Sequence, residues 1–307
     1  MKEQSHVWVY VLAVSAMAIW GVNVVMLKVL VEALPPATMT SFRIMLAGIT
    51  IVVIVLLNKS FTSLVKAEWI YLLLGALFGV VIHHYFLAQG LTLINASNTV
   101  LILALVPLTT SILAVLLLGD KLTKWRLFGV ALAFLGVLLI QGGSGSFSIH
   151  KGEIYIFIAM FAQALSFIYI KKATKTLSSK QVTGMMLVIG SLSLLFISLI
   201  LEPSGMSEMT SAPLSIYIIF FVSSILATAG GQFALNYAIE RIGAGQAAIF
   251  NNFVPFFGLI SAAIFLGERV YWFQLISFFF IVAGVLFGTG FVERTWIKPV
   301  SLQGKSM

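Results

Sequence analysis

Polar and charged side chains that interrupt long apolar stretches are the residues of this chain with the means to bind or transform a molecule. In the stretch 7–31, Trp20 and Asn23 are three residues apart, so on a helix they would present an aromatic wall and an amide to a cavity. The alternative is that Asn23 bonds the backbone of a neighbouring helix while Trp20 packs between helices. Lys28 either extends its ammonium group to a polar interface or guards the mouth of such a cavity.

Arg43, in the stretch 37–57, is the only basic residue well inside an apolar segment. A charge in that position has to face protein or water, and it needs a partner. One interpretation is that Arg43 attracts an anionic group such as the carboxylate of a substrate. The other is a structural bond to backbone carbonyls or to Glu32.

Two adjacent histidines, His83 and His84, lie in the stretch 69–91. Because histidine titrates near neutral pH, one hypothesis makes one of them a proton relay, and the alternative is a packed or hydrogen-bonded ring. The acidic residues offer no competing relay, because all ten fall in loops or at the ends of apolar stretches. The lack of a central carboxylate disfavours coupling to a proton or a sodium ion through Asp or Glu.

Stripes of polar residues at helical spacing mark two further stretches, 69–91 and 214–236. Such stripes in an otherwise apolar helix point inward, so we expect them to line a binding site, with hydrogen bonding between helices as the alternative. A weaker set of the same kind, Gln163, Ser166 and Tyr169, lies in the stretch 153–170. The first stripe is Tyr85, Gln89 and Thr92, and the second comprises Gln232 with Asn236 and Phe233 with Tyr237 and Glu240. The residues expected to line the site are Tyr85, Gln89, Gln232, Asn236 and Tyr237.

Pro107 and Pro255 sit near the middles of two apolar stretches. A proline removes a backbone donor and releases the carbonyl four residues earlier, so each is expected to kink its helix and to serve as a hinge. The alternative is a static bend satisfied by neighbouring helices. Asn251 and Asn252, beside the second kink, add amides that would meet a substrate.

Catalytic and metal-binding patterns are not visible in the sequence. It offers no nucleophile with a matching base and acid, no His and Glu cluster with metal-ligand spacing, and no phosphate-binding glycine loop. The chain has no cysteine, which excludes disulfides, Cys-ligated zinc or iron-sulfur centres and thiol nucleophiles. We therefore expect neither an enzyme nor a protein that holds a metal or another cofactor.

The composition explains why so few residues could do chemistry. Of 307 residues, 60% are hydrophobic and 9% charged, and the mean hydropathy is +1.09, whereas soluble domains are about 25% charged. The chain is therefore expected to be an integral membrane protein, with lipid as a partner. The net charge of +8 would favour nucleic acid for a soluble protein, but these basic residues lie between apolar stretches, so no nucleic-acid partner is expected.

Ten apolar stretches bounded by charge, Gly or Pro are predicted to be transmembrane helices. None of them shows the short alternation of barrel strands, so the fold class is all-α and polytopic. The first stretch resembles a signal peptide up to Ala18, but its apolar run continues to Val31 and predicts an uncleaved helix. The stretches are 7–31, 37–57, 69–91, 96–118, 127–141, 153–170, 182–201, 214–236, 244–266 and 272–291.

The basic residues predict an orientation. With the N-terminus inside, fourteen Lys and Arg residues fall in loops on that side and three on the other, while Arg43 lies within a segment. Positive residues favour the cytoplasmic side, so both termini are expected in the cytoplasm.

A repeat runs through the chain at an offset of 148 residues. Pro107 corresponds to Pro255, Gly119-Asp120-Lys121 to Gly267-Glu268-Arg269, Gly136 to Gly284, Tyr85 to Phe233 and Ala96 to Ala244. A repeat unit of five helices is odd-numbered, so the second copy enters the membrane from the opposite side. The sequence thus predicts two inverted repeats, 1–145 and 146–307, an architecture typical of alternating-access transporters.

These residues resemble the EamA type of the drug/metabolite transporter superfamily over almost the whole chain. The resemblance rests on Trp20-Gly21-x-Asn23 with Lys28, on Pro35-Pro36 followed by Phe42-Arg43, and on the repeated Pro…Leu-Gly-(Asp/Glu)-(Lys/Arg). It implies a central substrate cavity and export of amino acids, metabolites or drugs across the bacterial inner membrane. The first half departs from the usual Leu-Gly-Glu, since it has Leu118-Gly119-Asp120.

The function expected from these observations is a secondary transporter, and specifically an exporter, of small organic solutes by alternating access. A channel-like facilitator without ion coupling is the alternative, and a membrane-embedded enzyme is disfavoured. The sequence leaves open the substrate, the direction, the coupling and the oligomeric state.

Overall fold

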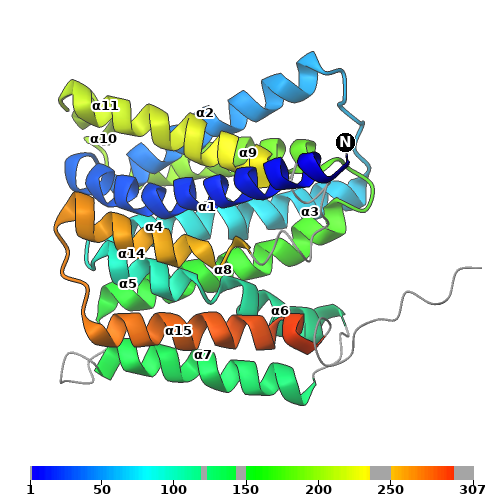
Figure 1. Ribbon diagram of the computed structural model, residues 1–307. Helices are drawn as coiled ribbons and strands as arrows, with labels where there is room; N and C mark the ends of the chain where they lie inside the picture. The colour runs from blue at the N-terminus through cyan, green and yellow to red at the C-terminus, as the bar shows by residue number, and fades with distance from the viewer. Residues whose placement is uncertain (1, 119–122, 143–149, 236–249, 294–307) are drawn as a thin grey trace, which may run out of the picture.

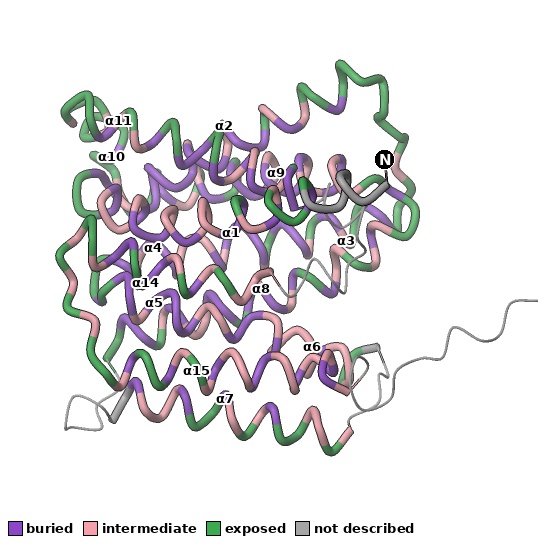
Figure 2. The backbone as a smooth tube through the Cα atoms, viewed as in Figure 1, coloured by how far each residue is buried: buried purple, intermediate pink, exposed green. Residues whose placement is uncertain are grey.

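The protein is described by a computed structural model over residues 2–118, 123–142, 150–235 and 250–293. Every regular element in these ranges is helical, and the helices lie side by side in one bundle (Figure 1). Buried residues concentrate on the inward faces of the helices, and exposed residues lie on the outer faces and at the ends (Figure 2). The all-α prediction is confirmed for the described residues.

The elements follow the predicted apolar stretches closely. The first half holds α1 (Lys2–Ala33), α2 (Pro36–Leu57), α3 (Lys66–Ala76), the π-helix η1 (Leu77–Ile82), α4 (His83–Leu91), α5 (Ala96–Leu103), α6 (Val106–Leu118) and α7 (Lys124–Gly142). The second half holds α8 (Lys151–Ala173), α9 (Ser179–Leu201), α10 (Gly205–Glu208), α11 (Leu214–Phe221), the π-helix η2 (Val222–Gly230), α14 (Phe253–Leu266) and α15 (Trp272–Gly288).

Seven helical segments of the described chain are long and apolar enough to cross a membrane. Two more helices, α14 and α15, are apolar but shorter. The 14 residues of α14 would cover about 21 Å of a hydrocarbon core about 30 Å thick. The protein is therefore a polytopic membrane protein, and the count of ten spans stays a prediction.

Both prolines predicted to kink their helices lie just after a break. The helix of the fourth stretch stops at Leu103 and resumes at Val106, and α14 begins at Phe253 after a turn at residues 251–252. Proline near a helix start costs no hydrogen bond, because its missing N–H has no intrahelical partner there. The interruptions agree with the predicted kinks, and their action as hinges stays a prediction.

Two helix pairs join distant parts of the chain. α2 packs along α9, and α7 packs along α15 at one edge of the bundle (Figure 1). A Cβ added at Gly129 would lie 2.2 Å from the backbone nitrogen of Gly288, and one at Gly284 would lie 2.6 Å from that of Ala133. Glycine therefore lets the backbones of α7 and α15 approach closely, as it does in other membrane helix pairs.

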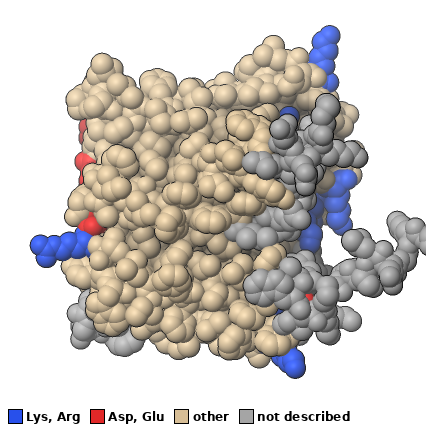
Figure 3. Space-filling model, in the orientation of Figure 1, with Lys and Arg blue, Asp and Glu red and all other residues tan. Residues whose placement is uncertain are grey.

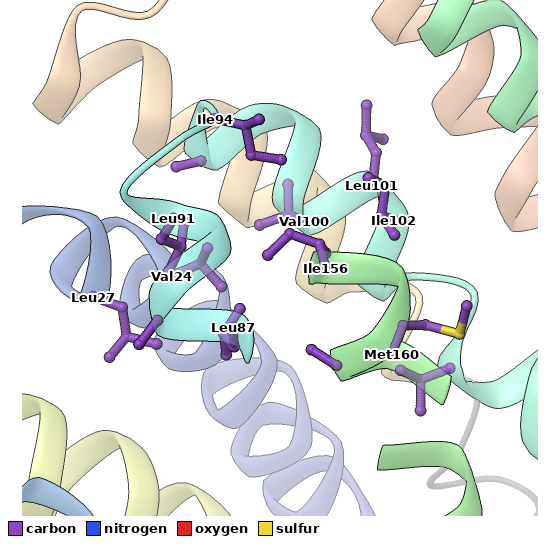
Figure 4. Packing of buried hydrophobic residues seen from close by; sticks show 14 of the residues in the cluster. Val24, Leu27, Leu87, Leu91, Ile94, Val100, Leu101, Ile102, Ile156 and Met160 are labelled. Atoms are coloured by element: carbon purple, nitrogen blue, oxygen red, sulfur yellow. The ribbon is translucent and has the colours of Figure 1, made fainter. Parts of the chain in front are cut away.

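An apolar core joins the remaining helices between these two pairs. Val24 and Leu27 from α1, Leu87 from α4, Val100 from α5 and Ile156 from α8 are all less than 8% exposed and meet in one cluster (Figure 4). This packing fixes the positions of α1 and α4, which carry several predicted site residues.

Glutamate side chains from later segments cap two helices of the first half. Glu202 accepts hydrogen bonds from the backbone N–H groups of Ala37 at 2.9 Å and Thr38 at 2.8 Å at the start of α2. Glu268 does the same for Ala96 at 2.8 Å and Ser97 at 2.9 Å at the start of α5. A carboxylate at a helix N-terminus satisfies orphan donors and complements the helix dipole.

Lys28 closes the opposite kind of helix end. Its Nζ donates to the carbonyl of Leu91 at 2.7 Å, at the last residue of α4, and lies 3.0 Å from Glu32. Lys28 therefore bonds a helix C-terminus, where a positive charge is favourable, and does not simply extend into a polar interface.

Enlarging Gly129 should disrupt the α7 and α15 pair. We expect Gly129→Leu to lower the free energy of unfolding by about 1–3 kcal/mol or more, because its Cβ has no room against α15. Thermal unfolding of the detergent-purified protein measures the effect. Ala131→Leu, on the exposed side of the same helix, is the matched control, and equal losses in both variants would contradict the packing role.

Neutralising Glu268 should weaken the start of α5. We expect Glu268→Gln to lower the free energy of unfolding by roughly 1–2 kcal/mol, because an amide loses the charge-assisted bonds to two backbone N–H groups. The control is Glu208→Gln at an exposed glutamate that accepts from Ser204. A Glu268→Gln protein as stable as the control would speak against the cap.

Candidate functional site

A chain of polar side chains connects α1, α2 and η2 inside the bundle. Arg43 of α2 donates from Nη1 to the hydroxyl of Thr228 at 2.9 Å and to that of Ser223 at 3.5 Å. The Ser223 hydroxyl donates to Oδ1 of Asn23 at 2.6 Å, and the Thr228 hydroxyl donates to the carbonyl of Ser223 at 2.9 Å. Each hydroxyl thus donates once and accepts from Arg43, and we call Asn23, Arg43, Ser223 and Thr228 the polar cluster.

Trp20 joins the same region from the next turn of α1. Its indole Nε1 donates to the carbonyl of Ala227 at 2.9 Å, and Gly231 leaves room for the ring. The structure thus brings Trp20, Asn23 and Arg43 together against η2. Asn23 bonds a side chain there, whereas Trp20 bonds the backbone.

Arg43 is buried, and no carboxylate within the described part of the chain bonds it. It is 1% exposed, and about 10 Å of helix separates it from the start of α2 at Pro36. Among the described residues, its hydrogen bonds go to hydroxyl groups only, while Glu32 pairs with Lys28. The predicted structural bond to Glu32 is therefore wrong, because Lys28 is one helical turn from Glu32 on the same helix.

The two histidines follow η1 at the start of α4. His83 is 8% exposed, and its Nδ1 lies 2.9 Å from the carbonyl of Ala159 in α8. The rings of His83 and His84 meet edge to face with centroids 4.6 Å apart.

Tyr85 and Gln89 are half-buried on α4. The Tyr85 ring packs edge-on against Phe86, with centroids 5.3 Å apart. Gln89 accepts through its backbone carbonyl from the Thr92 hydroxyl at 2.8 Å, so Thr92 is turned toward its own helix.

Residues of the weaker predicted set lie on α8. Gln163 is half-buried, and its carbonyl accepts from the hydroxyl of Ser166 at 2.8 Å. Ser166 is fully buried against Gly79 of η1. Tyr169 stacks on Phe78 with centroids 5.9 Å apart, so Ser166 and Tyr169 both pack against η1.

The remaining predicted residues lie near the second helix break or beyond the described chain. Gln232 follows η2 and is half-buried, as is Asn252 in the turn before α14. Pro255 is buried in α14 and Pro107 is half-buried in α6. Asn236, Tyr237 and Glu240 lie outside the described residues.

The π-helices are the features that sequence reasoning missed. η1 and η2 replace α-helix within the third and eighth apolar stretches. π-Helices are rare in proteins, and those that occur are often found at functional sites. Ser223 and Thr228, which carry the polar cluster, belong to η2. In the sequence, Ser223 and Thr228 look like any other Ser or Thr of an apolar stretch. Only their contact with Arg43 in the structure marks them as part of the polar cluster.

The described residues contain no group of three or more His, Cys, Asp and Glu side chains that could hold a metal ion. The arrangement is suited to binding: donors and acceptors from three helices meet deep in an apolar bundle. Polar groups inside a polytopic helical bundle are typical of membrane transport proteins, in which they mark substrate and ion pathways. The chain belongs to the EamA-like transporter family, which matches residues 7–142 and 150–289.

Several similar proteins are named as transporters. The uncharacterized transporter YyaM of Bacillus subtilis is 26% identical, and the match covers 94% of this chain and 95% of YyaM. A chloroplastic WAT1-related protein of Arabidopsis thaliana is 26% identical over 86% of this chain and 65% of its own length. A protein of known crystal structure, 18% identical, matches the fold with a TM-score of 0.63 over 94% of this chain and 98% of that one.

Removing the Ser223 hydroxyl should destabilise the polar cluster. We expect Ser223→Ala to lower the free energy of unfolding by about 1–3 kcal/mol, because Asn23 loses its donor and Arg43 loses an acceptor in a buried site. Thermal unfolding in detergent tests this. Ser193→Ala, at an exposed serine that bonds only its own helix backbone, should change little. A Ser223→Ala protein indistinguishable from that control would refute the contribution of the polar cluster to stability.

Proposed function

We propose that this protein is a secondary transporter that exports small organic solutes across the bacterial inner membrane by alternating access. The observation that carries the proposal is the polar cluster, in which Asn23 and Arg43 from the first half meet Ser223 and Thr228 from the second. Polar groups buried between membrane helices are costly and mark substrate pathways. Trp20, beside the polar cluster, supplies an aromatic surface.

In this proposal, the transporter consists of two inverted five-helix repeats, residues 1–145 and 146–307. Several features related by the 148-residue offset support it. η1 (Leu77–Ile82) corresponds to residues 225–230, within η2, and the break at 104–105 corresponds to 252–253, where α14 begins. The pairs α2 with α9 and α7 with α15 are those that a two-fold exchange of the repeats would map onto themselves. The family match in two stretches agrees with this division.

In this proposal, the moving parts are the interrupted helices. Pro107 and Pro255 lie just after the breaks, and a broken helix can tilt there without losing regular hydrogen bonds. The glycine-packed pair α7 and α15 would form the static frame. Binding residues from both halves would then face one side of the membrane and afterwards the other, as inverted repeats exchange conformations.

We propose that Tyr85, Gln89, Gln163, His83, Gln232 and Asn252, with Asn236 and Tyr237, extend the binding site around the polar cluster. All but the last two are buried or half-buried in the described bundle. The proposed topology has both termini in the cytoplasm. It is supported by the view of Figure 3, in which Lys and Arg residues gather at one end of the bundle, while the other end shows acidic residues together with a protruding basic side chain.

Counterflow in proteoliposomes tests the proposal. Vesicles preloaded with an unlabelled mixture of amino acids, or with an unlabelled drug mixture, should accelerate the uptake of the matching labelled compounds, because a carrier returns faster when it is loaded. Uptake without this acceleration would favour the channel-like facilitator, and no uptake from either mixture would count against both.

Truncating Trp20 should reduce the accelerated uptake about tenfold, the effect of losing roughly 1.4 kcal/mol of binding. Trp8→Ala is the matched control, because Trp8 is on the same helix and is 62% exposed. Equal activity of Trp20→Ala and Trp8→Ala would remove Trp20 from the site.

A further inference from the structure

Three buried polar atoms near the polar cluster have no hydrogen-bond partner among the described residues. They are Oγ1 of Thr40, Nε of Arg43 and Nδ1 of His84. Thr40 and Arg43 are each 1% exposed, so bulk water does not satisfy them. Buried donors of this kind are rare in folded proteins, and each calls for a partner.

The three residues lie on two helices that pack against each other. Thr40 and Arg43 are three residues apart on α2 and share a helix face. α2 packs against α4, which carries His84. Nδ1 of His83 lies 2.9 Å from the carbonyl of Ala159, whereas Nδ1 of His84 has no partner among the described residues.

The three atoms share one chemical character. A guanidinium nitrogen only donates, a hydroxyl can donate, and a neutral imidazole can carry its proton on Nδ1. Arg43 brings one full positive charge, and its described partners Ser223 and Thr228 are dipoles that do not neutralise it. A buried charge without a counter-ion is costly, and a bound anion would relieve that cost.

We propose that Thr40, Arg43 and His84 form the subsite for the carboxylate of an organic acid substrate. This proposal rests on the proposed transport function and names its substrate class. A carboxylate accepts from several donors at once and carries a single negative charge, which matches the single fixed charge of Arg43. A phosphate dianion would leave one charge uncompensated, so carboxylates are the better match. Amines and neutral amides lack the group that this subsite binds.

Matched pairs of ligands test the proposal on the full-length protein in detergent. The probes are isocaproate, benzoate and hydrocinnamate, each compared with its primary amide, at neutral pH. At least one acid should raise the unfolding temperature by about 2–4 °C at saturation, because ligands that bind only the folded state stabilise it. No amide should do so. The proposal is overturned if no acid stabilises the protein more than its amide.

Variants then assign the binding to these residues. Arg43→Gln should abolish the shift, and Thr40→Val and His84→Asn should each raise the acid Kd severalfold, which keeps the test valid if Arg43→Gln does not fold. The matched control is Arg126→Gln, because Nε of Arg126 is also buried without a partner, and its helix α7 lies at the opposite edge of the bundle from α2 (Figure 1). An acid shift that persists in Arg43→Gln, or an acid Kd unchanged in both Thr40→Val and His84→Asn, overturns the assignment.

Counterflow of labelled benzoate separates this proposal from the transport function. Acid binding that requires Arg43 but drives no counterflow would keep the carboxylate subsite and overturn the carrier. Counterflow of amides or amines together with an absence of acid binding would keep the carrier and overturn the subsite.

Discussion

Hydrocarbon offers no partner to a backbone N–H or C=O group, and this constraint governs where a membrane helix can start, break or end. The protein meets it with charged side chains that reach across the bundle. Glu202 and Glu268 close the starts of α2 and α5, and Lys28 closes the end of α4. Each of these bonds joins two different segments of the chain, so the same bond caps a helix end and fixes the position of that helix in the bundle.

The interior polar cluster obeys the same requirement. Ser223 and Thr228 each have one hydroxyl proton, and both protons are used within the protein, toward Asn23 and toward the backbone. That leaves only oxygen lone pairs to face Arg43. In the part of the chain that the structure describes, the guanidinium group is thus held in place by neutral groups and keeps its full charge. Charged side chains lie at both ends of the bundle (Figure 3). Arg43, by contrast, is a cation within the membrane region, and its hydrogen bonds go to hydroxyl dipoles.

Much of the fold could be predicted because its determinants are local. Apolar run length predicted the helices, and Pro107 and Pro255 predicted kinks close to the points where the structure interrupts the helices, because a missing N–H acts on its own turn. Trp20, Asn23 and Arg43, singled out from the sequence, do come together against η2, and their role in binding stays a prediction. Their partners could not be predicted, since Ser223 and Thr228 lie 180 and 185 residues from Arg43 in sequence. The π-helices have no simple hydropathy signal, because they change hydrogen-bond register without changing composition.

The carboxylate caps also bear on how the chain is made. Glu202 follows the α2 residue Ala37 by 165 positions, and Glu268 follows Ala96 by 172. At a synthesis rate of about 5–20 residues per second, α2 and α5 exist for on the order of ten seconds or longer before their capping residues are translated. During that interval, water or lipid headgroups must hold the exposed N–H groups. The bundle therefore reaches its final hydrogen bonding only after its last helices enter the bilayer, and a ribosome that stalls midway leaves a nascent chain whose early helices lack their caps.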